Sequence, residues 1–178
     1  MIRGGARWAG PHTQRGEVRR VVLKDAVLDH LTYTFEKEAW QLSLAMAVAG
    51  LSARQASWKP APERHSIWQI VCHVILWKQG VLEAWEGKVP DMKVLEQADW
   101  QEISGDDAAW EADVKALHEV SSRVKERVGM ADDAALAALL PTYQDVPDQA
   151  MAIRAMRMAT HDSYHAGQIQ YIRALQGA

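Results

Sequence analysis

Cysteine, phenylalanine and long apolar runs are scarce in this chain of 178 residues. The one cysteine, Cys72, excludes an intramolecular disulfide and paired-cysteine zinc sites, and it favours a reducing cytoplasm. The longest apolar candidate, residues 42–51, is far shorter than the roughly 20 residues that span a membrane. Glycine-rich phosphate loops and the serine-hydrolase elbow pattern are also absent. We therefore expect a cytoplasmic protein that does not partner with membranes.

The N-terminal segment differs in charge from the rest of the chain. Residues 1–24 hold six basic side chains and one acidic side chain, although the net charge of the whole chain is −3. Residues 1–16 contain glycine and proline but no apolar periodicity or secretory apolar run, so we expect a disordered basic leader, with a functional arm as the alternative. Trp8 is its only aromatic residue, so no nucleic-acid partner is expected. Residues 17–178 are expected to form one domain.

Apolar side chains recur every three or four positions in four stretches, which predicts four amphipathic helices. Ser66 is a plausible cap for the second helix, and Pro147 fits the first turn of the fourth. Residues 87–104 lack this periodicity and are interpreted as a long crossover, with room for a short helical piece. No strand pattern competes, so the predicted fold is all-α, a four-helix bundle with a long crossover between helices two and three. The predicted helices span residues 17–50, 66–86, 104–129 and 147–177, with a further short helix over 132–140.

Two histidines four positions apart, His161 and His165, lie in the last predicted helix. On an α-helix they differ by about 40° in direction and about 6 Å in rise, so both can reach one ion. Two side chains hold a metal weakly, so a third ligand is expected on the inner face of another helix. His73, in the apolar second helix, is the best candidate, and Gln168 is placed to orient one imidazole. The sequence therefore predicts a metal site made of His73, His161 and His165.

Simpler explanations exist for each of these histidines taken alone. Helical histidine pairs also occur on solvated faces, and a core histidine such as His73 often bonds to a backbone carbonyl. Three histidines on inward faces are harder to satisfy in that way, because an unpaired buried imidazole is costly to desolvate. The order His-Asp-x-x-His also departs from the His-Glu-x-x-His of zinc proteases, since Asp162 is too short to place its carboxylate as that glutamate does.

The other histidines and the cysteine are expected to lie outside the site. His12, His65 and His118 are expected to be solvated, and His30 is retained as a candidate neighbour of a metal ligand. Cys72 adjoins His73 in sequence but points about 100° away on the helix, which favours a small buried apolar role.

Three motifs resemble the DinB-like superfamily of bacterial proteins, the damage-inducible family and not the polymerase that shares the name. They are Trp58-x-Pro60, Ser66-Ile67-Trp68-x-Ile70-x-x-His73 and His161-x-x-x-His165-x-Gly167-Gln168. The resemblance covers nearly all of the chain after residue 20. It implies a four-helix bundle with an unusual helix order, often a homodimer, with a metal at the three histidines. Relatives include bacillithiol and mycothiol S-transferases and a mycothiol-dependent maleylpyruvate isomerase, but no substrate residue carries over.

Three neutral imidazoles leave a divalent ion with its full charge and an open position, as in catalytic sites. A low-molecular-weight thiol that binds there would be deprotonated and become a nucleophile. We therefore expect a metal-dependent enzyme of the thiol S-transferase type, acting on a small-molecule thiol and an electrophile. Imidazole suits zinc, nickel and iron alike, so the metal stays open. A metal-dependent hydrolase and a non-catalytic dimeric stress or interaction protein are the alternatives.

Overall fold

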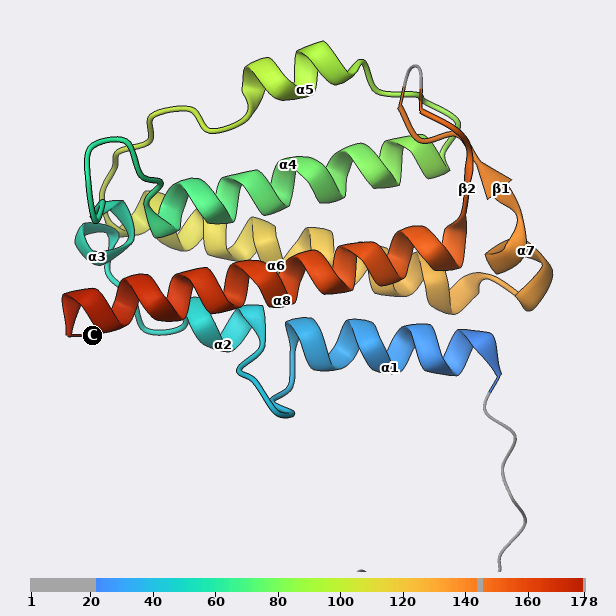
Figure 1. Cartoon of the computed structure of the whole chain (residues 1–178), viewed down its shortest axis with the longest axis horizontal. Helices are drawn as coiled ribbons and strands as arrows, with labels where there is room; N and C mark the ends of the chain where they lie inside the picture. The colour runs from blue at the N-terminus through green and yellow to red at the C-terminus, as the bar shows by residue number, and fades with distance from the viewer. Residues whose placement is uncertain (1–21, 144–145, 178) are drawn as a thin grey trace, which may run out of the picture.

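The computed structural model describes residues 22–143 and 146–177, and the predicted all-α class is confirmed. Helices α1, α4, α6 and α8 lie side by side, with α1 against α8 and α6, and α4 against α6 and α8 (Figure 1). The predicted leader, residues 1–16, lies outside the described part of the chain. The helices are α1 (Leu23–Phe35), α2 (Leu44–Val48), α3 (Ala53–Ser57), α4 (Ile67–Trp85), α5 (Met92–Ala98), α6 (Asp107–Met130), α7 (Asp133–Ala137) and α8 (Met151–Gln176).

The predicted first helix, residues 17–50, is wrong in its continuity. The structure has α1, a connection over residues 36–43, and the separate short helix α2. Ser43 is fully buried and its hydroxyl accepts a hydrogen bond from the Met46 amide, so it starts a new helix. Both helices face the same core, which is why the apolar spacing continues across the break. Residues 17–21 lie outside the described part.

Helix α4 follows its prediction closely because its start is doubly capped. The Ser66 hydroxyl accepts from the Gln69 amide at 3.2 Å, and the Gln69 side chain accepts from the Ser66 amide at 3.0 Å. Helix α6 is capped by Asp106, whose side chain accepts a hydrogen bond from the Ala109 amide. Gly177, with φ of +69°, ends α8 in the left-handed conformation that suits glycine.

The start of α8 differs from its prediction because a short sheet precedes it. Strands β1 (Leu139–Leu140) and β2 (Gln149–Ala150) pair antiparallel, with Leu139 opposite Ala150. The chain is therefore extended up to Ala150, and α8 begins at Met151 instead of near Pro147. Strands of two residues are too short to show an alternating pattern, so they could not be predicted from the sequence.

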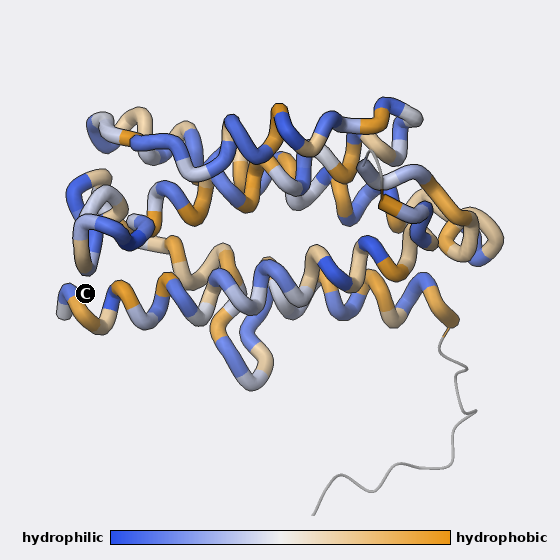
Figure 2. The backbone as a smooth tube through the Cα atoms, turned by 45° about the horizontal axis from the view of Figure 1, so that its top comes forward, coloured by the Kyte–Doolittle hydropathy of each residue, from blue (hydrophilic) through white to orange (hydrophobic). Residues whose placement is uncertain are grey.

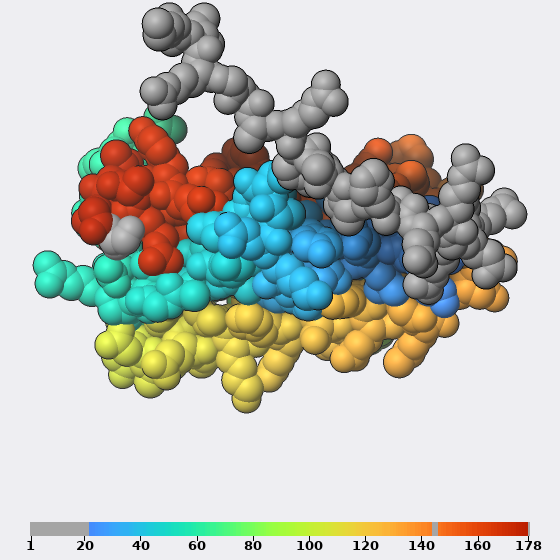
Figure 3. Space-filling view, turned by 90° about the horizontal axis from the view of Figure 1, so that it is seen from below, coloured from blue at the N-terminus to red at the C-terminus, as the bar shows by residue number. Residues whose placement is uncertain are grey.

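The amphipathic helices enclose one apolar core. Figure 2 shows apolar and polar residues alternating along the long helices, and Figure 3 shows the α1 to α3 segment lying between α8 and α6. Trp68 and Trp110 are almost fully buried, and their indole N–H groups donate to Asp113 and to the Leu51 carbonyl. Within the described ranges, no helix is both long and apolar enough to cross a membrane.

The crossover between α4 and α6 contains a short helix and then returns along α4. It contains α5, as the prediction allowed, and Figure 1 shows it passing along the outer side of α4. After α5 the chain returns over residues 99–106 to the start of α6. This return places Asp99 and Trp100 against the middle of α4.

Candidate metal centre

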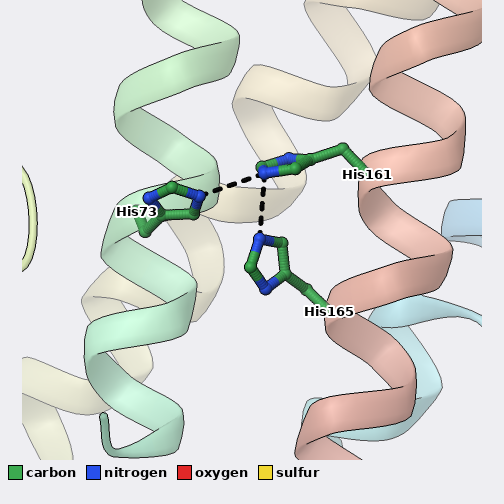
Figure 4. A group of neighbouring side chains, drawn as sticks. All are labelled: His73, His161 and His165. Atoms are coloured by element: carbon green, nitrogen blue, oxygen red, sulfur yellow. Dashed lines mark hydrogen bonds between the residues drawn. The ribbon is translucent and has the colours of Figure 1, made fainter.

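The structure brings together the three histidines that the sequence singled out. His73 extends from α4, and His161 and His165 extend from successive turns of α8 toward it (Figure 4). The Nε2 atom of His161 lies 3.0 Å from that of His73 and 2.9 Å from that of His165. His165 is buried and the other two are half-buried. The three ring nitrogens thus point to one place between two helices.

The outer nitrogen of His73 is held by a carboxylate. The Asp99 oxygens lie 2.8 and 2.9 Å from Nδ1 of His73. The same carboxylate accepts hydrogen bonds from the Trp77 indole at 2.9 Å and from the Trp100 amide at 3.0 Å. A carboxylate with these partners keeps the proton of His73 on Nδ1, so Nε2 presents its lone pair to the centre.

Trp100 fixes the ring plane of His73. Its indole stacks on the His73 ring with centroids 4.1 Å apart, and His65 stacks on the opposite face of the indole at 3.8 Å. Trp100 has φ of +56°, which is unusual for a residue other than glycine. The Gln69 side chain donates to the carbonyls of Trp100 at 3.3 Å and of Gln101 at 3.0 Å, which holds this strained backbone in place.

The outer nitrogen of His165 is held by an amide, as the sequence predicted for Gln168. Its Oε1 lies 2.7 Å from Nδ1 of His165, and its Nε2 donates to the Tyr164 hydroxyl at 3.0 Å. In this arrangement the amide oxygen of Gln168 faces the imidazole and its NH₂ group faces the Tyr164 hydroxyl. The proton of His165 is therefore on Nδ1, and its Nε2 also presents a lone pair.

The three imidazoles are neutral in this arrangement. Burial, together with the neighbouring His161 and His73, lowers the pKa of His165 to about 3. Burial, together with His73 and Lys78, lowers the pKa of His161 to about 4. Burial also lowers the pKa of His73, although the Asp99 carboxylate opposes that shift. Neutral imidazole is the form that ligates a metal.

The hydrogen-bond pattern fits a cation better than it fits three free imidazoles. Neutral His161 carries one proton, and an Nε2–H on it can be donated fully to His73 or to His165 but not to both. One inward lone pair then has no donor, which is costly for a buried nitrogen. An ion accepts all three lone pairs, so the residues present fit a divalent metal.

Two cavities lie beside the three histidines. One, of about 320 Å³, is lined by His161 together with Trp77 and Met158. The other, of about 510 Å³, is lined by Gln168 and His65. We call them the His161 cavity and the Gln168 cavity. His161 itself is open to a space that is large enough for a small molecule.

The remaining predicted neighbours lie elsewhere or act differently. His30 and His118 are exposed, so the suggestion that His30 supports a ligand is wrong. His65 is exposed as predicted, but it also packs on Trp100. Cys72 is half-buried with its sulfur 3.6 Å from Asp113, and burial raises its pKa to about 12. Its thiol is therefore protonated and inert.

Sequence reasoning missed Asp99 and Trp100. Both lie in the crossover, where no periodicity indicates which side chains face inward. The one available signal was chemical: a ligating histidine normally donates its second N–H to a carboxylate, and the crossover must pass near His73. Asp162, adjacent to His161, is fully buried against Lys78 instead, with Oδ2 2.8 Å from Nζ.

Comparison with family models identifies a family that matches most of the chain. A model described as the DinB superfamily matches residues 37–169, a range that includes all three histidines and Asp99. Comparison with curated proteins and with solved structures gave no match. The match covers most of the chain and agrees with the motifs around His73 and His161.

Proposed function

Because the chain belongs to the DinB superfamily and directs three imidazole lone pairs to one point, we propose that it is a metal-dependent enzyme. Its ligands are His73, His161 and His165, and its ion is a divalent transition metal: zinc, nickel or iron. The observation that carries the proposal is the convergence of the three imidazoles: the Nε2 atoms of His73 and His165 both lie within hydrogen-bond distance of the Nε2 atom of His161, and the three ligand atoms lie within 4.8 Å of one another. The proposed reaction class is thiol-dependent S-transfer, in which a small thiol attacks an electrophile.

The ion, when bound, supplies positive charge and an open position that lowers the pKa of a thiol. The protein supplies the rest. Asp99 and Gln168 hold the outer protons of His73 and His165, so neither ring can turn away. Trp77 and Trp100 cover His73 and exclude water from its side of the centre.

The surroundings of the centre favour the transferase over the hydrolase. Many metal-dependent hydrolases place a carboxylate base within about 3 Å of the attacking water. Among the residues that the structure describes, Asp99 is the only carboxylate that bonds to the three histidines, and its oxygens are taken by His73, Trp77 and Trp100. A thiol needs no such base once its pKa is lowered. The His161 cavity likewise favours an enzyme over a non-catalytic bundle, which has no need of an open space there.

The test uses cobalt-substituted protein and a small thiol such as 2-mercaptoethanol. Direct binding of sulfur produces a sulfur-to-metal charge-transfer band, whereas bound water does not. The Cys72→Ala variant is the matched control, because it removes the only protein thiol. We expect the same band in both proteins. If cobalt stays bound but millimolar thiol gives no band, the transferase assignment is wrong.

We also propose a homodimer that works in the cytoplasm. Tyr164 and Tyr171 are more than half exposed on the outer side of α8, and Ile153 is 42% exposed on the same helix, so α8 offers aromatic and apolar surface to a second copy. Light scattering of the purified protein tests this: a mass of one chain at micromolar concentration excludes a stable dimer.

A further inference from the structure

A buried arginine lines the His161 cavity. Arg154, in the first turn of α8, is 8% exposed, and its guanidinium lies 4.4 Å from the centre of the Tyr143 ring. In the ranges 22–143 and 146–177, no carboxylate lies within ion-pairing distance of it. Arginine is almost never buried without an anionic partner.

Among the described residues, the group that faces the Arg154 guanidinium is the Tyr143 side chain. Burial lowers the pKa of Arg154, and the facing Tyr143 offsets that only in part. Arginine nevertheless stays protonated in proteins, so the charge persists and an anion that enters the cavity meets it. The Tyr143 side chain lies against the guanidinium and can engage only part of its five N–H donors.

The other cations of the cavity are already engaged. Lys78 donates to Asp162 at 2.8 Å and to Ser121 at 2.7 Å. Arg157 donates to Gln149 at 2.6 Å near the rim. Arg154 differs from both, because among the described residues no carboxylate or amide oxygen accepts a hydrogen bond from it and only the Tyr143 side chain faces its guanidinium. The remaining wall is apolar and includes Trp77, Val81, Val146 and Met158.

Arg154 and His161 both line the His161 cavity. They are seven residues apart on α8, which is two turns and about 10 Å along the same face. A molecule that reaches both must therefore carry its anionic group and its reacting atom at opposite ends. The apolar wall lies between these ends.

We propose that Arg154 binds the carboxylate of an elongated organic acid whose apolar body lies along Trp77 and Met158. The opposite end of this acid is placed at His161. This assignment rests on the proposed function for the role of the acid as substrate, but not for its binding. A single guanidinium fork matches one carboxylate in two parallel hydrogen bonds.

Calorimetric titration of the full-length protein tests the proposal, with and without metal. The probes are 4-phenylbutanoate and its neutral match, 4-phenylbutanamide. We expect the wild type to bind the carboxylate about tenfold more tightly than the amide, because a charge-assisted hydrogen bond replaces a neutral one. Arg154→Gln removes that preference, while Arg154→Lys retains part of it because the charge remains without the fork. Arg123→Gln, on the exposed face of α6, is the matched control and keeps the full preference.

The outcomes separate this inference from the proposed function. Metal content is measured on the same samples. If the wild type binds no metal but still prefers the carboxylate, the proposed metal-dependent function is wrong and the role of Arg154 stands. Equal affinity for acid and amide in the metal-loaded wild type refutes the role of Arg154, as does a preference that survives in Arg154→Gln. If Arg154→Gln does not fold, the role of Arg154 is tested by the acid–amide preference of the wild type and of Arg154→Lys. Tighter binding of 4-phenylbutyl phosphate than of the carboxylate would assign the cavity to phosphate esters and overturn the proposal.

Discussion

Replacing Asp99 by asparagine should weaken metal binding while leaving all three ligands in place. The carboxylate is 7% exposed and accepts hydrogen bonds from His73, Trp77 and the Trp100 amide. Asparagine has a similar shape but offers one oxygen and no charge, and its NH₂ group faces donors. His73 then loses both the fixed position of its proton and the negative charge that makes it a stronger ligand.

The size of the effect follows from the role of such carboxylates. Loss of a partner that holds a ligating histidine costs about 10–100-fold in metal affinity, or about 1.4–2.8 kcal/mol. Competition for zinc against a chromophoric chelator measures this directly. Unfolding in urea should show a loss of about 1–3 kcal/mol in the metal-free variant, because buried N–H groups lose a charged acceptor.

Glu102→Gln is the matched control for Asp99→Asn. Glu102 lies in the same connection, but its side chain is 81% exposed and pairs with Lys59 at the surface. The control also removes one negative charge, so it reports any general electrostatic effect on the metal. Wild-type affinity in Asp99→Asn, or equal weakening in both variants, would refute the assigned role of Asp99.

Three further predictions concern stability. In metal-free protein the free energy of unfolding should fall as the pH drops from about 6.5 to about 4. The pKa values of His161 (about 4) and His165 (about 3) are lowered in the folded state, so the unfolded state binds more protons in this range. Urea titrations at pH 7 and pH 5 in the presence of a chelator measure this difference, and equal free energies of unfolding at the two pH values would contradict the prediction. Lys78→Met should lower the free energy of unfolding by about 3–5 kcal/mol, because it leaves the fully buried Asp162 unpaired. Adding Asp162→Leu to this variant should recover most of the lost stability. A loss below about 1 kcal/mol for Lys78→Met in urea unfolding would be inconsistent with the buried pair. Deleting residues 1–16 should change neither melting temperature nor metal content, because the segment lacks apolar periodicity; loss of folded protein on truncation would show that it belongs to the domain.

The sequence predicted those parts of the molecule that depend on regular spacing. Helical periodicity gave α4, α6 and α8, and the four-residue step between His161 and His165 placed both rings on one face. Both rings point to His73 because α4 packs against α8. Capping chemistry was also readable at Ser66, where the hydroxyl and Gln69 form the complete pair.

Features without a local pattern were not predictable. The contact of Asp99 with His73 depends on a backbone turn at Trp100 with positive φ. Tryptophan does not favour this conformation, so the sequence does not predict the turn. The break after Phe35 has no proline or glycine to mark it, and only the buried cap at Ser43 explains it. The proposed role of Arg154 depends on its burial in the wall of the His161 cavity, and the spacing of residues in the sequence does not reveal that cavity.

Elemental analysis of the purified protein tests the central claim most directly. We compare the wild type, His161→Ala and the triple variant of His73, His161 and His165. The wild type should contain about one divalent transition ion per chain, and His161→Ala should lose at least about 90% of it, because two imidazoles hold a metal weakly. Chelation of the wild type should also lower its melting temperature, since the ion binds only the folded state. Undiminished metal in the triple variant would contradict the three-histidine centre.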